Sequence, residues 1–438
     1  MATEATMTAY PRRAYAWLVV AILIATAIIS YTDRQVLSLL VDPIRRDLGI
    51  SDTQVSLLMG AAFAVVYGVA GLPLGWLADR SSRRNLIVAG VVVWSLATIS
   101  CGLSRGFSEI FASRLFVGLG EAVLSPAAIA LISDYFPPRR RGFAVGLFLS
   151  GIAMGQGVAI LVGGGVLHAV DLGLLAHTAL ARLAPWRLVL LLIGVPGLVW
   201  SAAILIIREP VRRADETAQT GADTADAGRG LRVWLQAAPI YLVVASASLV
   251  DNAVGAWAPS VLIRGFGLDG GRVGIELGAL LTIGFGAGVI GGGALADWAG
   301  ARGGARAKMR AALIIGVLIL PVSLLMNAHR IGLVVAGTPL YFALSGMVTA
   351  IGFSAILDSA PNHRRGLAMS ISFFLNVAIG AGVGPTAVTE ISARVFGERA
   401  GLGPALSATM IGGYTLAIAS ALLALMALRS SQRRMAKA

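Results

Sequence analysis

Four charged residues stand out inside the apolar stretches of this sequence, where charge is costly. Asp33 and Arg34 interrupt the run at 15–40, and Arg114 and Glu121 lie within the run at 108–134. A charged side chain at the centre of a bilayer costs at least about 2.5–3.5 kcal/mol, so charges at such positions indicate function. We therefore take these four side chains as the candidate chemical groups.

Glu121 is the residue best placed to exchange a proton. It lies about 10.5 Å along a helix from Arg114, on nearly the same face, and near the middle of its apolar run. Loss of water favours the neutral form of a carboxyl group, whereas a nearby arginine favours the carboxylate. We expect Glu121 to be the main proton acceptor, with Asp33 as its partner. The alternative is a fixed arginine–glutamate pair that only holds two helices together.

The arginines are also suited to binding an anion, because the guanidinium fork matches a phosphate or a carboxylate. The run around 340–357 carries no charge, so we expect a cavity that is charged on one wall and apolar on the other. Such a cavity suits an amphiphilic, lipid-like anion, unless the uncharged run simply packs. The residues predicted to bind substrate are Arg34, Arg114, Glu121, Asp251 and Asn252.

A second set of charges lies at the ends of apolar runs. Gly75 permits close helix contact one turn before Asp79, whose carboxylate can accept hydrogen bonds from the N-terminus of a facing helix. Arg83 and Arg84 follow, and they can pair with a carboxylate such as Asp134.

These side chains must be positioned by membrane helices. The chain has 438 residues, of which 57% are hydrophobic and 13% are charged, whereas soluble domains carry about 25% charged residues. Stretches long enough to cross a bilayer, about 20 residues each, occur at 15–40, 53–78, 86–104, 108–134, 142–168, 186–207, 234–262, 273–298, 310–328, 332–357, 367–391 and 404–428. We predict an all-α membrane protein with twelve transmembrane helices. The distribution of arginine and lysine then places both termini in the cytoplasm.

The twelve stretches form two related halves. GWLAD at 75–79 recurs as GALAD at 293–297, and the same offset of 218 maps Asp33 onto Asp251. An offset of 224 maps Asp134, with the RRG at 140–142, onto Asp358 and the RRG at 364–366. We predict a six-helix bundle at 1–207, a flexible cytoplasmic linker at 208–233 and a second bundle at 234–438, with a small helix in the linker as an alternative.

These motifs resemble the major facilitator superfamily over essentially the whole chain. GWLADRSSRR at 75–84 matches the signature of its loop between helices 2 and 3. The stretch from Arg114 to Ala122 resembles its helix-4 motif, and the glycines at 151, 155 and 157 resemble its helix-5 motif, although Gln156 replaces a proline. YTDRQ at 31–35 is similar to the spinster branch, whose animal members export sphingosine 1-phosphate or lysophospholipids.

The resemblance implies a cytoplasmic gate that favours the outward-facing state when it is closed. Its predicted residues are Gly75, Asp79, Arg83, Arg84 and Asp134, with Asp297 and Asp358 as the counterpart in the second half.

Several function classes are disfavoured. The only lysines, Lys308 and Lys437, are not followed by Ser or Thr, so the chain has no ATP-binding phosphate loop. The four histidines show no ligand spacing, so we expect no metal or cofactor. The chain has no His-Glu-x-x-His motif and no catalytic triad, so we expect no enzyme activity. Most arginines lie in loops, in tails or at helix ends, where they form no basic soluble face, so we expect no nucleic-acid partner.

We expect a monomeric, proton-coupled transporter of an amphiphilic anion, working by alternating access among membrane lipids in the cell membrane, and specifically in a bacterial inner membrane. The alternatives are a transporter of a small organic carboxylate or drug-like compound, and a sensor that binds substrate without moving it.

Overall fold

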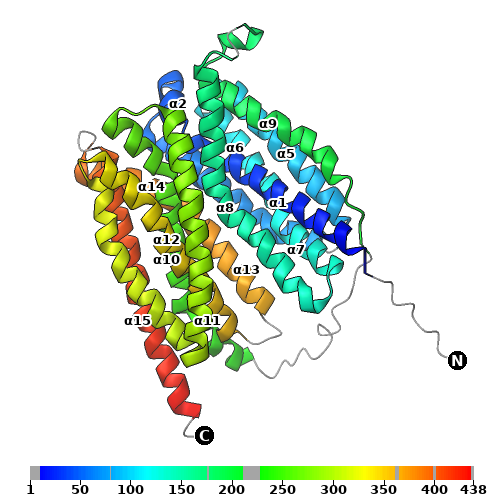
Figure 1. The fold of residues 1–438 in the computed structure, drawn as a ribbon, viewed down its shortest axis with the longest axis vertical. Coiled ribbons are helices and arrows are strands. Elements are labelled where there is room, and N and C mark those ends of the chain that lie inside the picture. Colours follow the sequence, from blue (N-terminus) through cyan, green and yellow to red (C-terminus); the bar gives the residue numbers. More distant parts are fainter. Residues whose placement is uncertain are drawn as a thin grey trace, which may run out of the picture.

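A computed structural model describes residues 10–78, 80–174, 177–210, 227–360, 365–397 and 401–435. These residues form helices and connecting turns without a strand (Figure 1). The first half contains α1 (Arg13–Gln35), η1 (Val36–Ser38), α2 (Val41–Leu48), α3 (Asp52–Met59), α4 (Ala61–Ala78), α5 (Arg83–Leu103), α6 (Phe107–Glu121), α7 (Leu124–Tyr135), α8 (Pro138–Asp171), η2 (Ala179–Arg182) and α9 (Pro185–Ile204). The second half contains α10 (Ala227–Phe266), α11 (Gly270–Leu324), η5 (Leu325–Asn327), α12 (Ile331–Ser359), α13 (Arg365–Leu375), η7 (Asn376–Ala381), α14 (Gly382–Ile391), η8 (Ser392–Phe396) and α15 (Leu402–Met435).

Each apolar stretch of the sequence forms a helix, which confirms the predicted fold class. Within the described residues, ten helical segments are long and apolar enough to cross a membrane. One of them, α11, contains two of the predicted spans, separated by a break at Gly303 and Gly304. Gly304 has φ of 56°, a backbone conformation that favours glycine. Another predicted span, 142–168, lies within the 34-residue α8.

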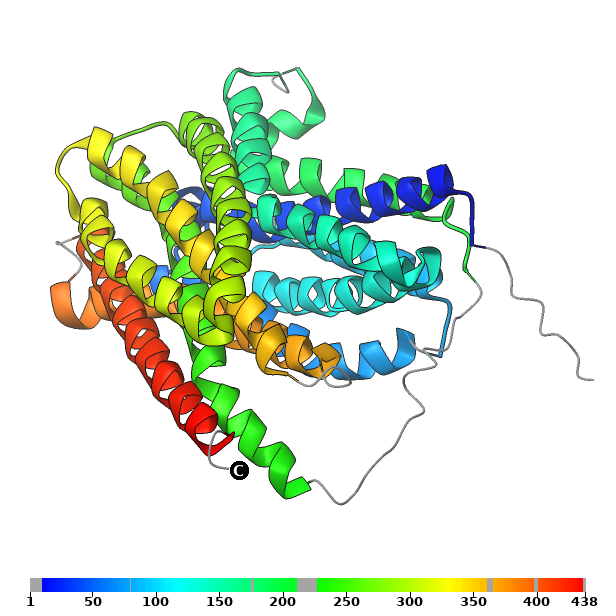
Figure 2. The same cartoon turned by 60° about the horizontal axis from the view of Figure 1, so that its bottom comes forward.

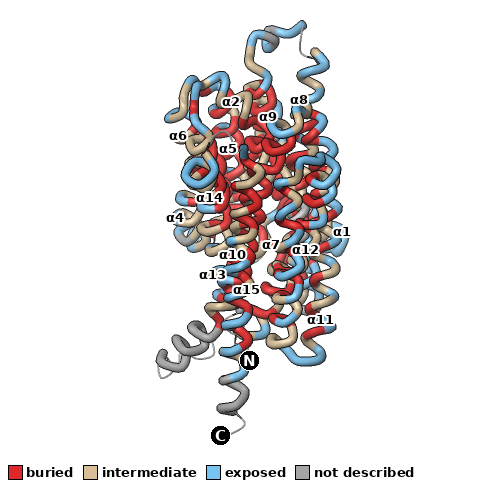
Figure 3. Tube along the Cα trace, turned by 90° about the vertical axis from the view of Figure 1, so that its left-hand side faces the viewer, coloured by how far each residue is buried: buried red, intermediate tan, exposed pale blue. Residues whose placement is uncertain are grey.

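The outer surface of the bundle is strongly apolar, as a lipid environment requires. Large hydrophobic side chains such as Val199, Ile290 and Ile314 are more than 60% exposed. A soluble monomer rarely exposes so much apolar surface. Figure 3 shows the buried residues concentrated in the interior of the bundle and the exposed residues on its outside. This distribution identifies a multi-pass membrane protein.

The helices form two groups, α1–α9 and α10–α15, which lie side by side (Figure 2). We call the face where α1 begins and α15 ends the terminal face, and the face that carries α2 the opposite face (Figure 1). At the opposite face, buried residues of the first half such as Ile110 and Trp186 share one continuous hydrophobic core with the second half. Nearer the terminal face, a second core consists mainly of first-half residues such as Ile87 and Leu131, and it includes Val377 and Ala381 of the second half. The two halves are therefore joined most firmly at the opposite face.

Several helix breaks coincide with the candidate residues. Helix α1 continues as the 3₁₀ turn η1 directly after Gln35, and α6 ends at Glu121. Pro126 explains the second break, because it has no N–H to donate to the carbonyl of Ala122. The predicted span at 53–78 is divided at Gly60, between α3 and α4. The helical framework is thus irregular where the charged side chains lie.

The predicted linker at 208–233 falls mostly outside the described residues, which omit 211–226. Its last part is helical, because α10 begins at Ala227. Its first part is fixed by Glu209, whose carboxylate accepts hydrogen bonds from Ser82 Oγ and from the backbone N–H groups of Arg83 and Arg84. An anion at the N-terminus of α5 is favoured by the helix dipole.

Candidate functional site

The centre of the candidate site is an ion pair between the first and fourth predicted membrane helices. Arg34 Nη2 lies 2.5 Å from Glu121 Oε2. The side chain of Glu121 is 1% exposed and that of Arg34 is 11% exposed. The pair therefore lies inside the bundle and not on its lipid-facing surface. The second oxygen of Glu121, Oε1, is buried and makes no hydrogen bond within the described part of the chain.

Aromatic rings surround the guanidinium group of Arg34. Its central carbon lies 3.9 Å from the ring centre of Phe63, 4.7 Å from that of Tyr31 and 5.7 Å from that of Tyr67. Cation–π attraction is worth about 0.5–2 kcal/mol, and more when water is excluded. The rings therefore hold the positive charge in place even if its carboxylate partner is lost.

Asp33 is completely buried beside this pair. Its carboxylate makes no ion pair in the described structure, and the hydroxyl of Thr98 is the hydrogen-bonding group beside it. Glu121 and Arg114 also act on it electrostatically. A buried carboxylate with so little compensation is energetically costly.

Arg114 lies near Asp33 but forms no ion pair with its carboxylate in the described structure. It donates instead to two backbone carbonyls, from Nε to Leu58 at 3.2 Å and from Nη1 to Asp33 at 3.3 Å. The carbonyl of Leu58 precedes the helix break at Gly60, where the regular hydrogen-bond ladder is interrupted. Arg114 thus ties three helices together through their backbones.

Glycines bring these helices close enough for the contacts to form. A Cβ on Gly118 would lie 2.7 Å from the carbonyl oxygen of Phe63, and one on Gly120 would lie 2.6 Å from that of Gly90. Any larger residue would push the fourth predicted membrane helix away from the second and third. The Gly-x-Gly-Glu sequence therefore combines close packing with a buried carboxylate.

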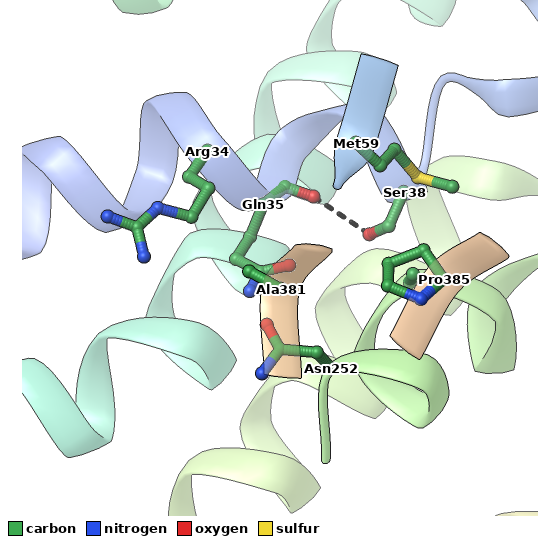
Figure 4. A pocket seen from close by; sticks show the side chains of 8 residues that line it. Arg34, Gln35, Ser38, Met59, Asn252, Ala381 and Pro385 are labelled. Atoms are coloured by element: carbon green, nitrogen blue, oxygen red, sulfur yellow. Dashed lines mark hydrogen bonds between the residues drawn. The ribbon is translucent and has the colours of Figure 1, made fainter. Parts of the chain in front are cut away.

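A small pocket between the two halves is continuous with this site (Figure 4). Arg34, Gln35 and Ser38 line it from the first half, and Asn252 lines it from the second. Its remaining lining is apolar and consists of Met59, Ala256, Ala381 and Pro385. The pocket joins one cation and polar side chains to an apolar wall.

The second half contains a buried polar network that the sequence did not reveal. Asp251 Oδ1 accepts hydrogen bonds from Tyr341 Oη at 2.7 Å and from Ser345 Oγ at 2.5 Å. Tyr414 Oη donates to Ser345 Oγ at 2.8 Å. Asp251 does not line the pocket, whereas its neighbour Asn252 does. The helix around 340–357 is therefore uncharged but not wholly apolar, because it supplies two hydroxyl groups.

At the terminal face, the structure brings together some of the predicted gating residues. Arg83 pairs with Asp134, and Arg84 donates to Asn85 and to the carbonyl of Ile207. A Cβ on Gly75 would meet no atom within 4 Å, so the close helix contact expected there is not made in this conformation. Asp79 lies outside the described residues.

The second half repeats the pairing between Arg83 and Asp134. Lys308 Nζ lies 2.5 Å from Asp358 Oδ2, while Asp297 is exposed. The sequence analysis missed Lys308 as the partner of Asp358. The internal repeat contained the signal for this pair. The offset of 224 that relates Asp134 to Asp358 also relates Arg83 to Ala307, the residue directly before Lys308.

The halves are sealed against each other toward the opposite face. A Cβ on Gly274 of α11 would lie 2.4 Å from the Cα of Gly164 in α8. On the same face, Arg264 of the second half pairs with Asp42 and Asp52 of the first, each at 2.8 Å. This seam must part for the central pocket to be reached from the opposite face.

Comparisons with known proteins agree with this architecture. Residues 23–385 match the family model described as Major Facilitator Superfamily. An efflux pump of this type from Mycolicibacterium smegmatis is 29% identical over 391 residues, which cover 87% of this chain and 85% of that protein. A protein of Escherichia coli described as a probable galactarate/D-glucarate transporter is 24% identical over 409 residues, which cover 84% of this chain and 87% of that protein.

Two further comparisons are with spinster proteins. Drosophila melanogaster protein spinster is 27% identical over 259 residues, which are 58% of this chain and 40% of that protein. A crystal structure of a bacterial homologue of the human lysosomal transporter Spinster, in an inward-facing and occupied conformation, superimposes with a TM-score of 0.77 at 23% identity. It covers 95% of this chain and 96% of that one, which demonstrates a shared fold.

Proposed function

The chain belongs to the major facilitator superfamily, and from this premise we propose that it is a proton-coupled secondary transporter of an amphiphilic organic anion. The observation that carries the proposal is the buried pair of Arg34 and Glu121 at the edge of the central pocket. Arg34 is the only positively charged residue that lines this pocket in the described structure. It is therefore the group that a substrate anion would meet first.

The coupling follows from competition for Arg34. While Glu121 is ionised, its carboxylate occupies the guanidinium group at 2.5 Å. A proton on Glu121 removes that charge and leaves Arg34 free to bind the substrate anion. Loss of the proton restores the pair and displaces the anion. Proton and anion therefore bind with positive coupling, and the gradients across the membrane decide the direction of net movement.

Asp33 assists this exchange in our proposal. Its carboxyl group is buried close to Glu121 and makes no ion pair in the described structure. Two neighbouring carboxyl groups repel each other when both are ionised, so a proton on either one relieves the other. Asp33 is then the partner that shares the proton with Glu121, while Arg114 fixes the helices and contributes positive charge.

The lining of the pocket supports an amphiphilic substrate. Arg34 suits a phosphate or carboxylate head group, and the wall of Met59, Ala256, Ala381 and Pro385 suits an apolar chain. A lysolipid or sphingoid phosphate combines both features. Of the residues predicted to bind substrate, Arg34 and Asn252 line the pocket.

A small hydroxylated carboxylate is the second candidate. The amides of Gln35 and Asn252 and the hydroxyl of Ser38 line the same pocket and can bind sugar hydroxyl groups. The relative from Escherichia coli is described as a galactarate/D-glucarate transporter, and sugar acids of this type are small carboxylates. Arg34 would bind the carboxylate of this substrate, and Glu121 and Asp33 would couple its binding to a proton as described above.

We further propose that the terminal face is cytoplasmic and carries the gate. Gly75, Asp79, Arg83, Arg84 and Asp134 would close the first half, with Asp297 and Asp358 as the counterpart in the second. In this proposal the bundles at 1–207 and 234–438 rock about the central pocket, joined by the linker at 208–233. The protein would act as a monomer in a bacterial inner membrane.

Counterflow in proteoliposomes tests the proposed function. Vesicles loaded with one unlabelled anion are mixed with its labelled form, and we expect counterflow that lysolipids inhibit more strongly than D-glucarate does. Stronger inhibition by glucarate would select the second candidate, and substrate-dependent stabilisation without counterflow would indicate a sensor. Coupling is tested separately by net uptake into vesicles that contain no anion but a pH-sensitive dye, where we expect proton entry together with the anion. Net anion uptake without proton entry would refute coupling.

A further inference from the structure

Asp251 is a buried carboxyl group that the mechanism above does not use. We propose that Asp251 is a second proton-binding site, located in the second half of the transporter and separate from the site at Glu121 and Asp33. The reaction is a simple protonation, in which the carboxylate gains one proton and becomes the carboxylic acid, and no other bond changes. This inference builds on the proposed function and adds a site to it.

The hydrogen bonds define where the proton would be held. Tyr341 and Ser345 both donate to Oδ1, and Tyr414 donates to Ser345, so two donors meet at one carboxylate oxygen and the third supports them through Ser345. All three hydroxyl-bearing residues are completely buried. Oδ1 already accepts two hydrogen bonds, which leaves Oδ2 as the oxygen that takes the proton.

The surroundings contain no cation to compensate a negative charge on Asp251. The titratable groups that face it are Tyr341 from α12 and Tyr414 from α15, and the described residues include no lysine, arginine or histidine paired with it. Arg34 lies across the central pocket but is paired with Glu121. Hydroxyl donors support a carboxylate only in part, since a buried ion normally needs an opposite charge. The site therefore suits a group that alternates between charged and neutral forms.

The internal repeat places this site at the same membrane depth as the first one. The offset of 218 carries Asp33 onto Asp251, and the offset of 224 carries Glu121 onto Ser345. The structure adds that Ser345 is bonded to Asp251, while Glu121 acts electrostatically on Asp33. Halves related by an axis along the membrane normal hold equivalent residues at equal depth. In the second half, Asn252 takes the place of Arg34, and Ser345 takes the place of Glu121.

A direct role in substrate binding fits the geometry less well. Asn252 lines the central pocket, whereas Asp251 bonds with α12 and α15 inside the second bundle. Asp251 is 8% exposed, which is enough for a proton or a water molecule to reach it but leaves little surface for an organic anion. Its negative charge would also repel such an anion.

Infrared difference spectroscopy on a pH change tests the site without requiring transport. Wild-type protein in lipid should show the carbonyl stretch of a protonated carboxyl group that is lost in Asp251→Asn and retained in Glu276→Gln. Glu276 is a matched control because it is an exposed carboxylate of the same half, paired with Arg272. Potentiometric titration should show a loss of about one bound proton per molecule in Asp251→Asn.

The variant Tyr341→Phe provides a second test, which remains available if Asp251→Asn does not fold. It removes one of the two hydrogen bonds to Oδ1 and should shift the frequency of the same band without abolishing it. An unchanged band in Asp251→Asn, or an unshifted band in Tyr341→Phe, would overturn the assignment. If the band is assigned to Asp251 but no anion moves protons in vesicles, the proposed function fails while the second site stands.

Discussion

Replacing Glu121 with glutamine is the sharpest test of competition for Arg34. Glutamine has nearly the shape of protonated glutamate, so Glu121→Gln imitates the state in which the guanidinium group is free. Substrate affinity should then become independent of pH and remain at the value that the wild type reaches only in acid. Transport driven by a pH gradient should be lost, while counterflow, which needs no net proton movement, should persist.

The size of the effect follows from the contact between Arg34 and Glu121. A hydrogen bond to a charged group contributes about 1.5–3 kcal/mol, and the 2.5 Å contact is a single bond of this type. An anion that must displace the carboxylate of Glu121 from Arg34 loses that amount of binding free energy. Since about 1.4 kcal/mol corresponds to a tenfold change in affinity, Glu121→Gln should bind the anion about tenfold to a hundredfold more tightly than wild type at alkaline pH.

Isothermal titration calorimetry of the purified protein at mildly acidic and mildly alkaline pH measures this difference. In buffers of different ionisation enthalpy, the same titrations report whether anion binding takes up a proton, which should occur in wild type and vanish in the variant. Glu276→Gln is the matched control, because it also removes the carboxylate of an arginine–glutamate pair, but an exposed one. If Glu121→Gln kept the pH dependence of wild type, the coupling mechanism would be refuted.

Three further predictions concern the seam between the halves and an ion pair inside the second half. Gly274→Val should force the two halves apart at the opposite face, because its Cβ would lie 2.4 Å from the Cα of Gly164. Spin labels on either side of the seam should then report a longer distance. The control is Gly286→Val, whose Cβ would meet no atom within 4 Å and which should leave that distance unchanged. Arg264→Ala should weaken the same seam by only about 1 kcal/mol, since partly exposed ion pairs contribute little, and the labels should show about a fivefold shift in populations rather than full opening. Lys308→Met should lower the thermal stability of the second half, because it leaves a carboxylate without its cation, and a return to wild-type stability in Lys308→Arg would identify charge as the cause.

The sequence by itself determined the fold class and the family. Apolar stretches of membrane length can satisfy their backbone groups only as helices in lipid, so each predicted span became a helix. Asp33, Arg34, Arg114 and Glu121 stood out because charge inside such a stretch is rare. The burial of Asp33, Arg114 and Glu121, and the mostly buried side chain of Arg34, agree with that argument.

The pairing of these side chains needed the tertiary structure. Depth along each helix was available from the sequence, but the rotation of one helix about its axis was not. Arg34 therefore pairs with Glu121, and Arg114 bonds to backbone carbonyls that are accessible near the break at Gly60. Such breaks depend on close helix approach, as at Gly60, where a Cβ would lie 2.4 Å from the carbonyl oxygen of Ala381.

Uncharged partners were the hardest to predict. Tyr341, Ser345 and Tyr414 look like ordinary residues of membrane helices, and only their convergence on Asp251 gives them a role. A charged residue in an apolar stretch is conspicuous in a sequence because its burial is costly wherever it lies. A hydroxyl group is tolerated on most helix faces, so its contribution depends on which neighbour the packing brings within hydrogen-bond distance.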